Sequence, residues 1–219
     1  MVIGSTGSGK TTILNAITGL VNPDYKIFSV EDVAEINIKH ENWFSLVART
    51  GFGPSGEGEI GLYDLIKSGV RHRPDYIVVG EIRGAEAYVM FQAMATGHGG
   101  LCTMHADSLE SAGKRLQQKP MDIPASYLSL MNCAIVIRRV KGQDGKSTRK
   151  AISVQEINTA DSYHSAFKWD PKSDYFDARL DDSIMFHRIA EQTGRDMEQI
   201  FAEYEKRKIV LKWLLQRGI

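Results

Sequence analysis

Residues 4–11 read GSTGSGKT, which fits the pattern G-x-x-x-x-G-K-[ST]. In such a segment the glycines let backbone N–H groups curl around a β-phosphate, the lysine reaches the β and γ oxygens, and the final hydroxyl binds Mg²⁺. Two apolar residues, Val2 and Ile3, precede the segment, and Lys10–Thr18 has a helical pattern. The stretch therefore predicts a phosphate-binding loop between a strand and a helix. Its candidate binding residues are Gly4, Ser5, Thr6, Gly7, Ser8, Gly9, Lys10, Thr11 and Thr12.

Short apolar runs alternate with helical patterns along the rest of the chain. The predicted strands are Val2–Ile3, Ile27–Val30, Tyr76–Val79, Leu101–Met104 and Ala134–Val140. The predicted helices are Lys10–Thr18, Leu62–Ser68, Ala85–Ala95, Ser108–Gln117 and Pro124–Asn132. Asp107 and Glu110 have the spacing of a capping box for the fourth helix. Strands alternating with helices predict an α/β fold with a mostly parallel sheet covered on both faces.

The pattern changes after Val140. Residues 141–145 predict a turn, and alternating segments at Ala151–Ile157 and Ser165–Trp169 predict an antiparallel extension of the sheet. Residues 181–219 predict two helices: Gly194 ends the first, and Asp196 with Gln199 caps the second.

This change of pattern suggests how the chain is organised. We expect a core over residues 1–157 and an appendage over residues 158–219, made of a hairpin strand and C-terminal helices. The glycine-rich residues 51–58 predict a loop. Only three residues precede Gly4, so we expect the first strand to be cut short.

The composition restricts the class of protein. The 27 Lys and Arg residues balance 27 Asp and Glu residues, whereas nucleic-acid-binding proteins usually carry a basic surplus. The hydrophobic fraction of 42% is that of a folded soluble protein. No apolar run approaches the roughly 18–20 residues of a membrane span. The cysteines, Cys102 and Cys133, lie in apolar segments and indicate no disulfide framework. These features predict a cytoplasmic globular protein.

Several predicted strands end in polar side chains. Glu31 follows the strand Ile27–Val30, Glu81 closely follows Tyr76–Val79, and His105 follows Leu101–Met104. Ligands of open α/β sheets bind beyond the carboxyl ends of the strands, so we expect these side chains to converge with the phosphate-binding loop. A carboxylate at such a strand end can hold the Mg²⁺ shell or orient water.

The histidines and arginines near these strands have more than one interpretation. His98, Cys102 and His105 could form a metal site, but their spacing fits no common zinc pattern, and a structural role for either histidine stays open. Arginine can stabilise charge on a transferring phosphate or form ordinary surface pairs. The arginines that flank the Glu81 strand are Arg71, Arg73 and Arg83.

The sequence resembles the secretion and type IV pilus ATPases, and within them the archaeal archaellum and secretion-type group. The segments that carry the resemblance are Gly4–Thr12, Ser29–Asp32, His40–Trp43, Arg71–Gly84, Ala95–Gly100 and Thr103–Ser108. Gly80-Glu81-Ile82-Arg83, with Glu where many ATPases have Asp, followed by two histidines, is highly specific to this family. The resemblance implies a RecA-like ATPase core that binds ATP and Mg²⁺ and acts in hexameric rings on a membrane platform protein, at the inner face of the membrane.

The resemblance also implies roles for individual residues. Lys10 and Thr11 would bind nucleotide and Mg²⁺, Glu31 matches the catalytic glutamate of the acidic box, and Glu81 matches the metal-side glutamate. The residues that match the histidine box, which couples nucleotide state to conformation, are His98 and His105. The candidate catalytic arginines are Arg71 and Arg83.

The sequence departs from the family pattern in three ways. Ala34 stands where many archaeal relatives carry Arg, and Cys102 stands where small hydroxyl residues are usual. The N-terminal domain of the family is absent from the sequence, so we expect this chain alone to be a weak ATPase.

Three functions stay open on the sequence. The first is a motor that powers pilus or archaellum assembly or protein secretion. The second is a DNA-moving ATPase of conjugation or uptake, although the neutral charge argues against a nucleic-acid partner. The third is a nucleotide-binding assembly module that does not turn over.

Overall fold

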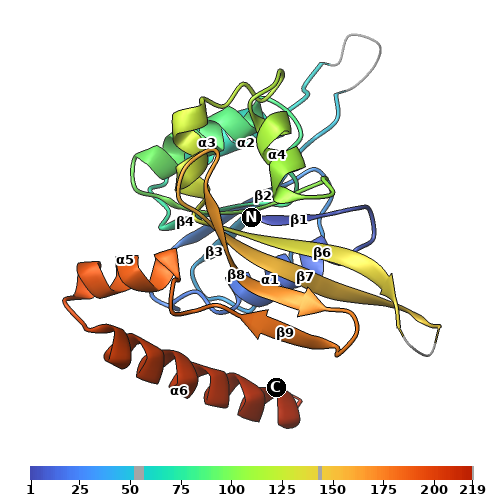
Figure 1. The fold of residues 1–219 in the computed structure, drawn as a ribbon. Coiled ribbons are helices and arrows are strands. Elements are labelled where there is room, and N and C mark those ends of the chain that lie inside the picture. The colour runs from blue at the N-terminus through green and yellow to red at the C-terminus, as the bar shows by residue number, and fades with distance from the viewer. Residues whose placement is uncertain (52–56, 143–144, 219) are drawn as a thin grey trace.

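The structure, a computed structural model, describes residues 1–51, 57–142 and 145–218 (Figure 1). The strands are β1 (Val2–Gly4), β2 (Ile27–Glu31), β3 (Trp43–Val47), β4 (Tyr76–Val79), β5 (Gly99–Met104), β6 (Cys133–Lys141), β7 (Ser147–Ile157), β8 (Tyr163–Asp170) and β9 (Tyr175–Ala178). The helices are α1 (Lys10–Thr18), α2 (Leu62–Val70), α3 (Glu86–Ala95), α4 (Leu109–Leu116), the 3₁₀ helix η1 (Ala125–Met131), α5 (Ile184–Thr193) and α6 (Met197–Gln216).

These strands form one sheet in the order β3-β2-β4-β5-β1-β6-β7-β8-β9. The pairs from β3 to β6 are parallel, and the pairs from β6 to β9 are antiparallel. Val2 of β1 pairs with Thr103 of β5 on one side and with Ile135 of β6 on the other. The phosphate-binding loop that follows β1 therefore opens at the centre of the sheet edge where the parallel strands end.

The inner parallel strands β1, β2 and β4 are buried on both faces. Val78 packs with Leu14 of α1 on one face, whereas Ile77 and Val79 pack with Phe91 of α3 on the other. Alternate residues of a strand point to opposite faces, so an unbroken apolar run serves both layers. Figure 1 shows α2, α3 and α4 over one face, with α1 and the C-terminal helices below the other. The predicted α/β fold with a mostly parallel sheet and an antiparallel extension is confirmed.

Two local predictions were wrong, and two edge strands were not predicted. Ser108, not Asp107, caps α4, because its extended backbone lets its hydroxyl accept the N–H of Ser111 at 3.1 Å. The helix predicted over Pro124–Asn132 is the 3₁₀ helix η1. The edge strands β3 and β9 were not predicted, because both are largely exposed and lack a buried apolar pattern. The predicted loop over residues 51–58 and turn over residues 141–145 fall partly outside the described residues.

The two C-terminal helices attach to the sheet through α5. Ser183 caps α5, and the buried carboxylate of Glu156 on β7 accepts hydrogen bonds from the Ser183 hydroxyl at 2.8 Å and the Ile184 N–H at 2.7 Å. The following helix, α6, begins with the predicted cap at Asp196, and Ile200 is its only fully buried residue among those described. The division at residue 157 stays a prediction, since β8 and β9 continue the sheet beyond it.

Candidate functional site

The loop between β1 and α1 has a backbone that only glycine adopts without strain. Gly7 and Gly9 have φ angles of 68° and 98°, in the left-handed region. A Cβ atom on Gly4 would lie 2.6 Å from the carbonyl oxygen of Ile137. The nine-residue helix α1 begins directly after Gly9, which provides no side-chain cap. Its first N–H groups are therefore available to an anion, and the helix dipole favours negative charge there.

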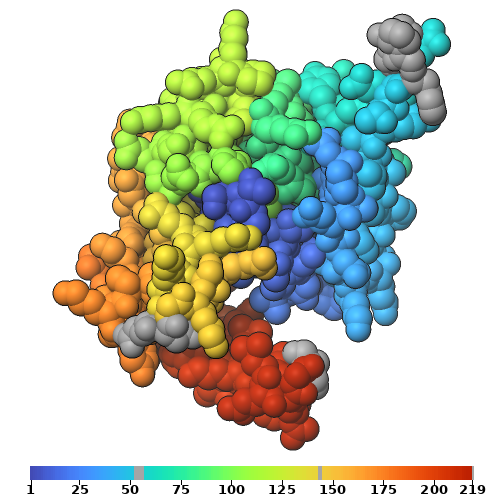
Figure 2. All heavy atoms as spheres, turned by 90° about the vertical axis from the view of Figure 1, so that its right-hand side faces the viewer, coloured from blue at the N-terminus to red at the C-terminus, as the bar shows by residue number. Residues whose placement is uncertain are grey.

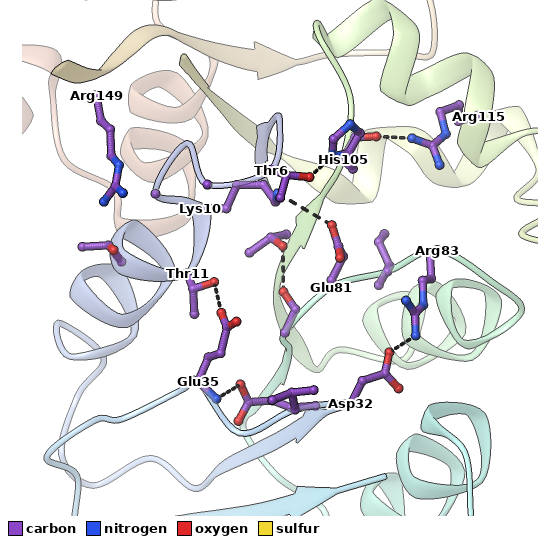
Figure 3. Close-up of a pocket in the computed structure, with 18 residues that line it drawn as sticks. Thr6, Lys10, Thr11, Asp32, Glu35, Glu81, Arg83, His105, Arg115 and Arg149 are labelled. Atoms are coloured by element: carbon purple, nitrogen blue, oxygen red, sulfur yellow. Dashed lines mark hydrogen bonds and ion pairs between the residues drawn. The ribbon is translucent and has the colours of Figure 1, made fainter. Parts of the chain in front are cut away.

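This loop forms one wall of a cavity of about 640 Å³ at the carboxyl edge of the sheet (Figure 3). Glu31 after β2, Glu81 after β4 and His105 after β5 line the same cavity. The structure thus brings together the three strand ends and the loop, as the parallel topology requires. Within the loop, Ser8 is fully buried. Thr12, at the start of α1, lines the cavity.

Lys10 extends along the loop into this cavity. Its Nζ atom donates to the Ser5 carbonyl at 3.3 Å and lies 3.7 Å from Glu81 Oε1. The side chain of Lys10 is 11% exposed and that of Glu81 is 41% exposed. A largely buried ammonium beside a phosphate-binding loop provides a positive charge where phosphate oxygens would lie.

Sequence reasoning missed Glu35, which the structure places beside Thr11. The Thr11 hydroxyl donates to Glu35 Oε2 at 2.7 Å (Figure 3). The segment around Glu35 is tied to α1, since Asn15 Oδ1 accepts the N–H of Asn37 at 3.2 Å. The only signal in the sequence was a further acid four residues after Glu31. Its side chain reaches the cavity because the segment after β2 folds back over α1.

Glu31 is the most buried acid of the site, at 2% exposure. Its Oε1 atom accepts the N–H groups of Glu35 at 2.9 Å and Ile36 at 2.8 Å, so the carboxylate shapes the segment after β2. Among the described residues its Oε2 atom has no hydrogen-bond partner. A buried carboxylate oxygen without a protein partner is costly, so Oε2 is an acceptor suited to a water molecule or ligand that enters the cavity.

Arg83 also reaches the cavity, where it forms an ion pair with Asp32. The turn that carries Arg83 is held by Glu86, whose Oε1 atom accepts the N–H groups of Arg83 at 2.6 Å and Gly84 at 2.7 Å. His105 lies on the loop side of the cavity, with Nδ1 3.4 Å from the Thr6 hydroxyl. Its carbonyl oxygen accepts a hydrogen bond from Arg115, another residue that sequence reasoning missed.

The structure does not bring His98, Arg71 and Arg73 into this cavity. His98 precedes β5, at the opposite end of that strand from His105, and its Nδ1 atom lies 3.0 Å from the Ala93 carbonyl. It lines a separate cavity of about 660 Å³. Arg71 caps the C-terminus of α2, and Arg73 lies in the turn before β4. Both arginines therefore lie at the amino end of β4, away from the phosphate-binding loop.

The residues present suit Mg²⁺ better than zinc. Within the described ranges, no group of three or more His, Cys, Asp and Glu side chains could hold a metal ion. Burial raises the pKa of the Cys102 thiol to about 11, which disfavours the thiolate that zinc requires. Mg²⁺ prefers oxygen ligands and needs only one or two protein ligands when phosphates complete its shell. The Thr11 hydroxyl and the Glu81 carboxylate fit that requirement.

A central parallel strand that leads into a phosphate-binding loop, with acids after the neighbouring strands, defines the class of P-loop nucleotide-binding proteins. The family described as Type II/IV secretion system protein matches residues 1–166, and the chain belongs to this family. The residues that line the cavity in Figure 3 all lie within the matched range.

Individual relatives agree with this assignment. An uncharacterized protein of Methanocaldococcus jannaschii is 40% identical over 218 residues, which cover 97% of this chain and 80% of the relative. The type IV secretion system protein PtlH of Bordetella pertussis is 34% identical over 162 residues, covering 67% of this chain and 47% of PtlH. The crystal structure of the VirB11 ATPase from the Brucella suis type IV secretion system, in complex with sulphate, gives a TM-score of 0.56 at 29% identity.

The VirB11 comparison covers 71% of this chain and 47% of VirB11. The matches to PtlH and VirB11 therefore span about half of those proteins. Over the residues that the structure describes, no helix combines the length and the apolarity needed to cross a membrane.

Proposed function

We propose that this chain is the ATPase domain of a motor that powers pilus or archaellum assembly or protein secretion. The observation that supports this most directly is the shared cavity of the phosphate-binding loop, Glu31, Glu81 and His105. Membership of the secretion family supports the motor role. In this proposal the working form is a hexameric ring, and it acts on an integral membrane platform protein at the cytoplasmic face of the membrane.

The chain's own groups suit hydrolysis of a γ-phosphate. The N–H groups at the start of α1 and the Lys10 ammonium would hold the β- and γ-phosphates. Thr11 and Glu81 would hold Mg²⁺, which neutralises developing charge on the phosphates when it is bound. The free Oε2 atom of Glu31 would accept a hydrogen bond from the attacking water and orient it. Arg83 would be recruited from Asp32 toward the charge that develops in the transition state.

The two histidines would act through one strand. His105 reaches the loop through the Thr6 hydroxyl at 3.4 Å, and His98 lies at the other end of β5. We propose that this strand transmits the nucleotide state from the loop to the opposite edge of the sheet. Arg71 also lies at that edge, so a role for Arg71 at a nucleotide would concern the site of a neighbouring subunit.

Replacement of Lys10 tests the nucleotide site. Lys10→Ala removes the charge that would face the β- and γ-phosphates, so the affinity for Mg-ATP should fall at least about tenfold. The melting temperature without nucleotide should stay unchanged. The measurement is a titration of the purified chain with a fluorescent ATP analogue. Lys39→Ala, at an exposed position outside the cavity, is the control. Equal binding by Lys10→Ala and the control would overturn the assignment.

A further inference from the structure

Arg149 reaches the cavity from an unexpected part of the chain. It lies on β7, in the antiparallel half of the sheet, yet it lines the same cavity as Lys10 and Thr11. Its side chain passes over the loop, because a Cβ atom on Gly9 would lie 3.4 Å from Arg149 Cδ. Figure 3 shows Arg149 on the opposite side of Lys10 from Glu81.

Lys10 and Arg83, two other cations of this cavity, have acidic partners, whereas Arg149 forms no ion pair with any described residue. Lys10 lies 3.7 Å from Glu81, and Arg83 is paired with Asp32. Across the described part of the chain, no carboxylate forms an ion pair with Arg149. Its guanidinium is therefore available to an anion that enters the cavity.

The ladder between β6 and β7 adds a second positive charge beside Arg149. Arg139 lies directly opposite it in the register, and like charges at such positions repel each other. Arg139 is held in place by its Nε–H, which donates to the Gly7 carbonyl at 3.1 Å. The structure thus places the Arg139 guanidinium beside Gly7 and the Arg149 side chain beside Gly9, an arrangement that a bound anion would stabilise.

A second cavity, of about 460 Å³, lies beside Arg149. It is lined by Arg139, Ser147, Thr148 and Arg149, so Arg149 borders both cavities. Glu81 and Asp32 lie on the other side of Lys10 from Arg149 (Figure 3), where the γ-phosphate would be attacked. A nucleotide bound with its β-phosphate in the loop would therefore direct its α-phosphate and nucleoside toward Arg149.

We propose that Arg149 binds the α-phosphate end of the nucleotide and that the second cavity receives the nucleoside. This inference rests on the proposed nucleotide-binding function and adds a binding residue from the antiparallel extension. The β6–β7 hairpin thereby becomes part of the nucleotide site. ATP and ADP share the α-phosphate and the nucleoside, so loss of Arg149 weakens the binding of both nucleotides. Loss of a γ-phosphate contact would weaken the binding of ATP alone.

The test is a calorimetric titration of the 219-residue chain with Mg-ATP and Mg-ADP. Arg149→Ala should lower the affinity for both nucleotides by a similar factor, about tenfold to a hundredfold, as expected for loss of a charge-assisted contact. Arg149→Lys retains the charge without the planar fork and should give an intermediate loss. It also provides a second variant should Arg149→Ala fold poorly. Lys141→Ala, on the same hairpin but outside both cavities, should bind as the unchanged chain does.

The outcomes separate this inference from the proposed function. Unchanged binding of both nucleotides by the Arg149 variants, with strong loss in Lys10→Ala, would overturn the inference alone. A loss confined to ATP would also overturn it, because the arginine would then contact the γ-phosphate. Unchanged binding in both the Lys10 and Arg149 variants would overturn the proposed function together with the inference.

Discussion

At the residue scale, Glu31 and Glu81 lie in the same cavity but in different surroundings. Glu31 is buried and uses one oxygen to hold the backbone, whereas Glu81 is partly exposed and faces Lys10. These partners support the separate roles proposed for them, with Glu31 acting on water and Glu81 on the metal side. The difference can be tested with isosteric amides, which preserve shape and remove charge.

Glu31→Gln should bind Mg-ATP but slow its hydrolysis by about a hundredfold or more, since loss of a water-orienting base acts on the chemical step. Glu81→Gln should also raise the Mg²⁺ concentration needed for half-maximal rate. Single-turnover assays across a Mg²⁺ series measure both effects, with Glu110→Gln, at an exposed position of α4, as the control. Wild-type turnover in both variants would refute the roles.

The cysteines provide a second prediction at this scale. Burial raises the pKa of Cys102 to about 11 and also raises that of Cys133. Only the thiolate reacts, and at pH 8 about a thousandth of Cys102 would be ionised. The native protein should therefore react slowly with a thiol reagent at pH 8 and faster as the pH rises toward 11. Unfolding in guanidinium should expose both thiols. Rapid reaction of both thiols in the native state would contradict the burial.

At the element scale, the attachment of α5 depends on one buried carboxylate. Glu156 is 5% exposed, and Ser183, which donates to it, is fully buried. Arg188 adds a weaker tie at the surface, donating to Asn132 Oδ1 at 2.8 Å. Buried polar groups of β7 therefore help to hold α5 on the sheet.

Glu156→Ala should destabilise the protein by about 1–3 kcal/mol, because it leaves the buried Ser183 hydroxyl and the part-buried Ile184 N–H without an acceptor. It should also make the chain more sensitive to protease before α5. Chemical denaturation and limited proteolysis measure these effects. Glu191→Ala, at an exposed position on α5, should change neither. Equal stability of the two variants would mean that apolar packing alone attaches α5.

At the scale of the whole molecule, burial is uneven. The parallel strands β1, β2 and β4 are almost entirely buried, whereas the second half of α6 exposes Ile209, Trp213 and Leu215. Figure 2 shows this C-terminal helix as a separate body of atoms below the rest of the molecule. Segments with few buried apolar contacts open locally without unfolding the core.

The rate of amide hydrogen exchange should therefore differ strongly between the sheet and the end of α6. Amides of β4 should exchange only through global unfolding, while those of residues 209–216 should exchange far faster. Mass spectrometry of peptides from dilute protein measures the difference. Protection of residues 209–216 as strong as that of β4 would contradict the prediction. If that protection disappeared on dilution, a second copy of the chain would be covering the helix.

Much of this architecture could be predicted because its causes are local. The bounds of α1 and β4 agree with the predictions, since helical periodicity and an unbroken apolar run are each encoded over a few residues. The caps at Gly194 and Asp196 were also correct, because a left-handed glycine and a capping box act within one turn. The convergence of Glu31, Glu81 and His105 followed from parallel strand topology.

The tertiary structure alone decided which side chains share the cavity. Glu35 reaches Thr11 because the segment after β2 folds back over α1, and Arg149 reaches the loop through the β6–β7 register. His98 lies outside the site because β5 separates it from His105 by its full length. These placements depend on contacts between residues far apart in the chain, which local periodicity does not encode. The amino-acid sequence by itself therefore determined the phosphate-binding loop and its strands, and the long-range packing determined the other residues that line the cavity.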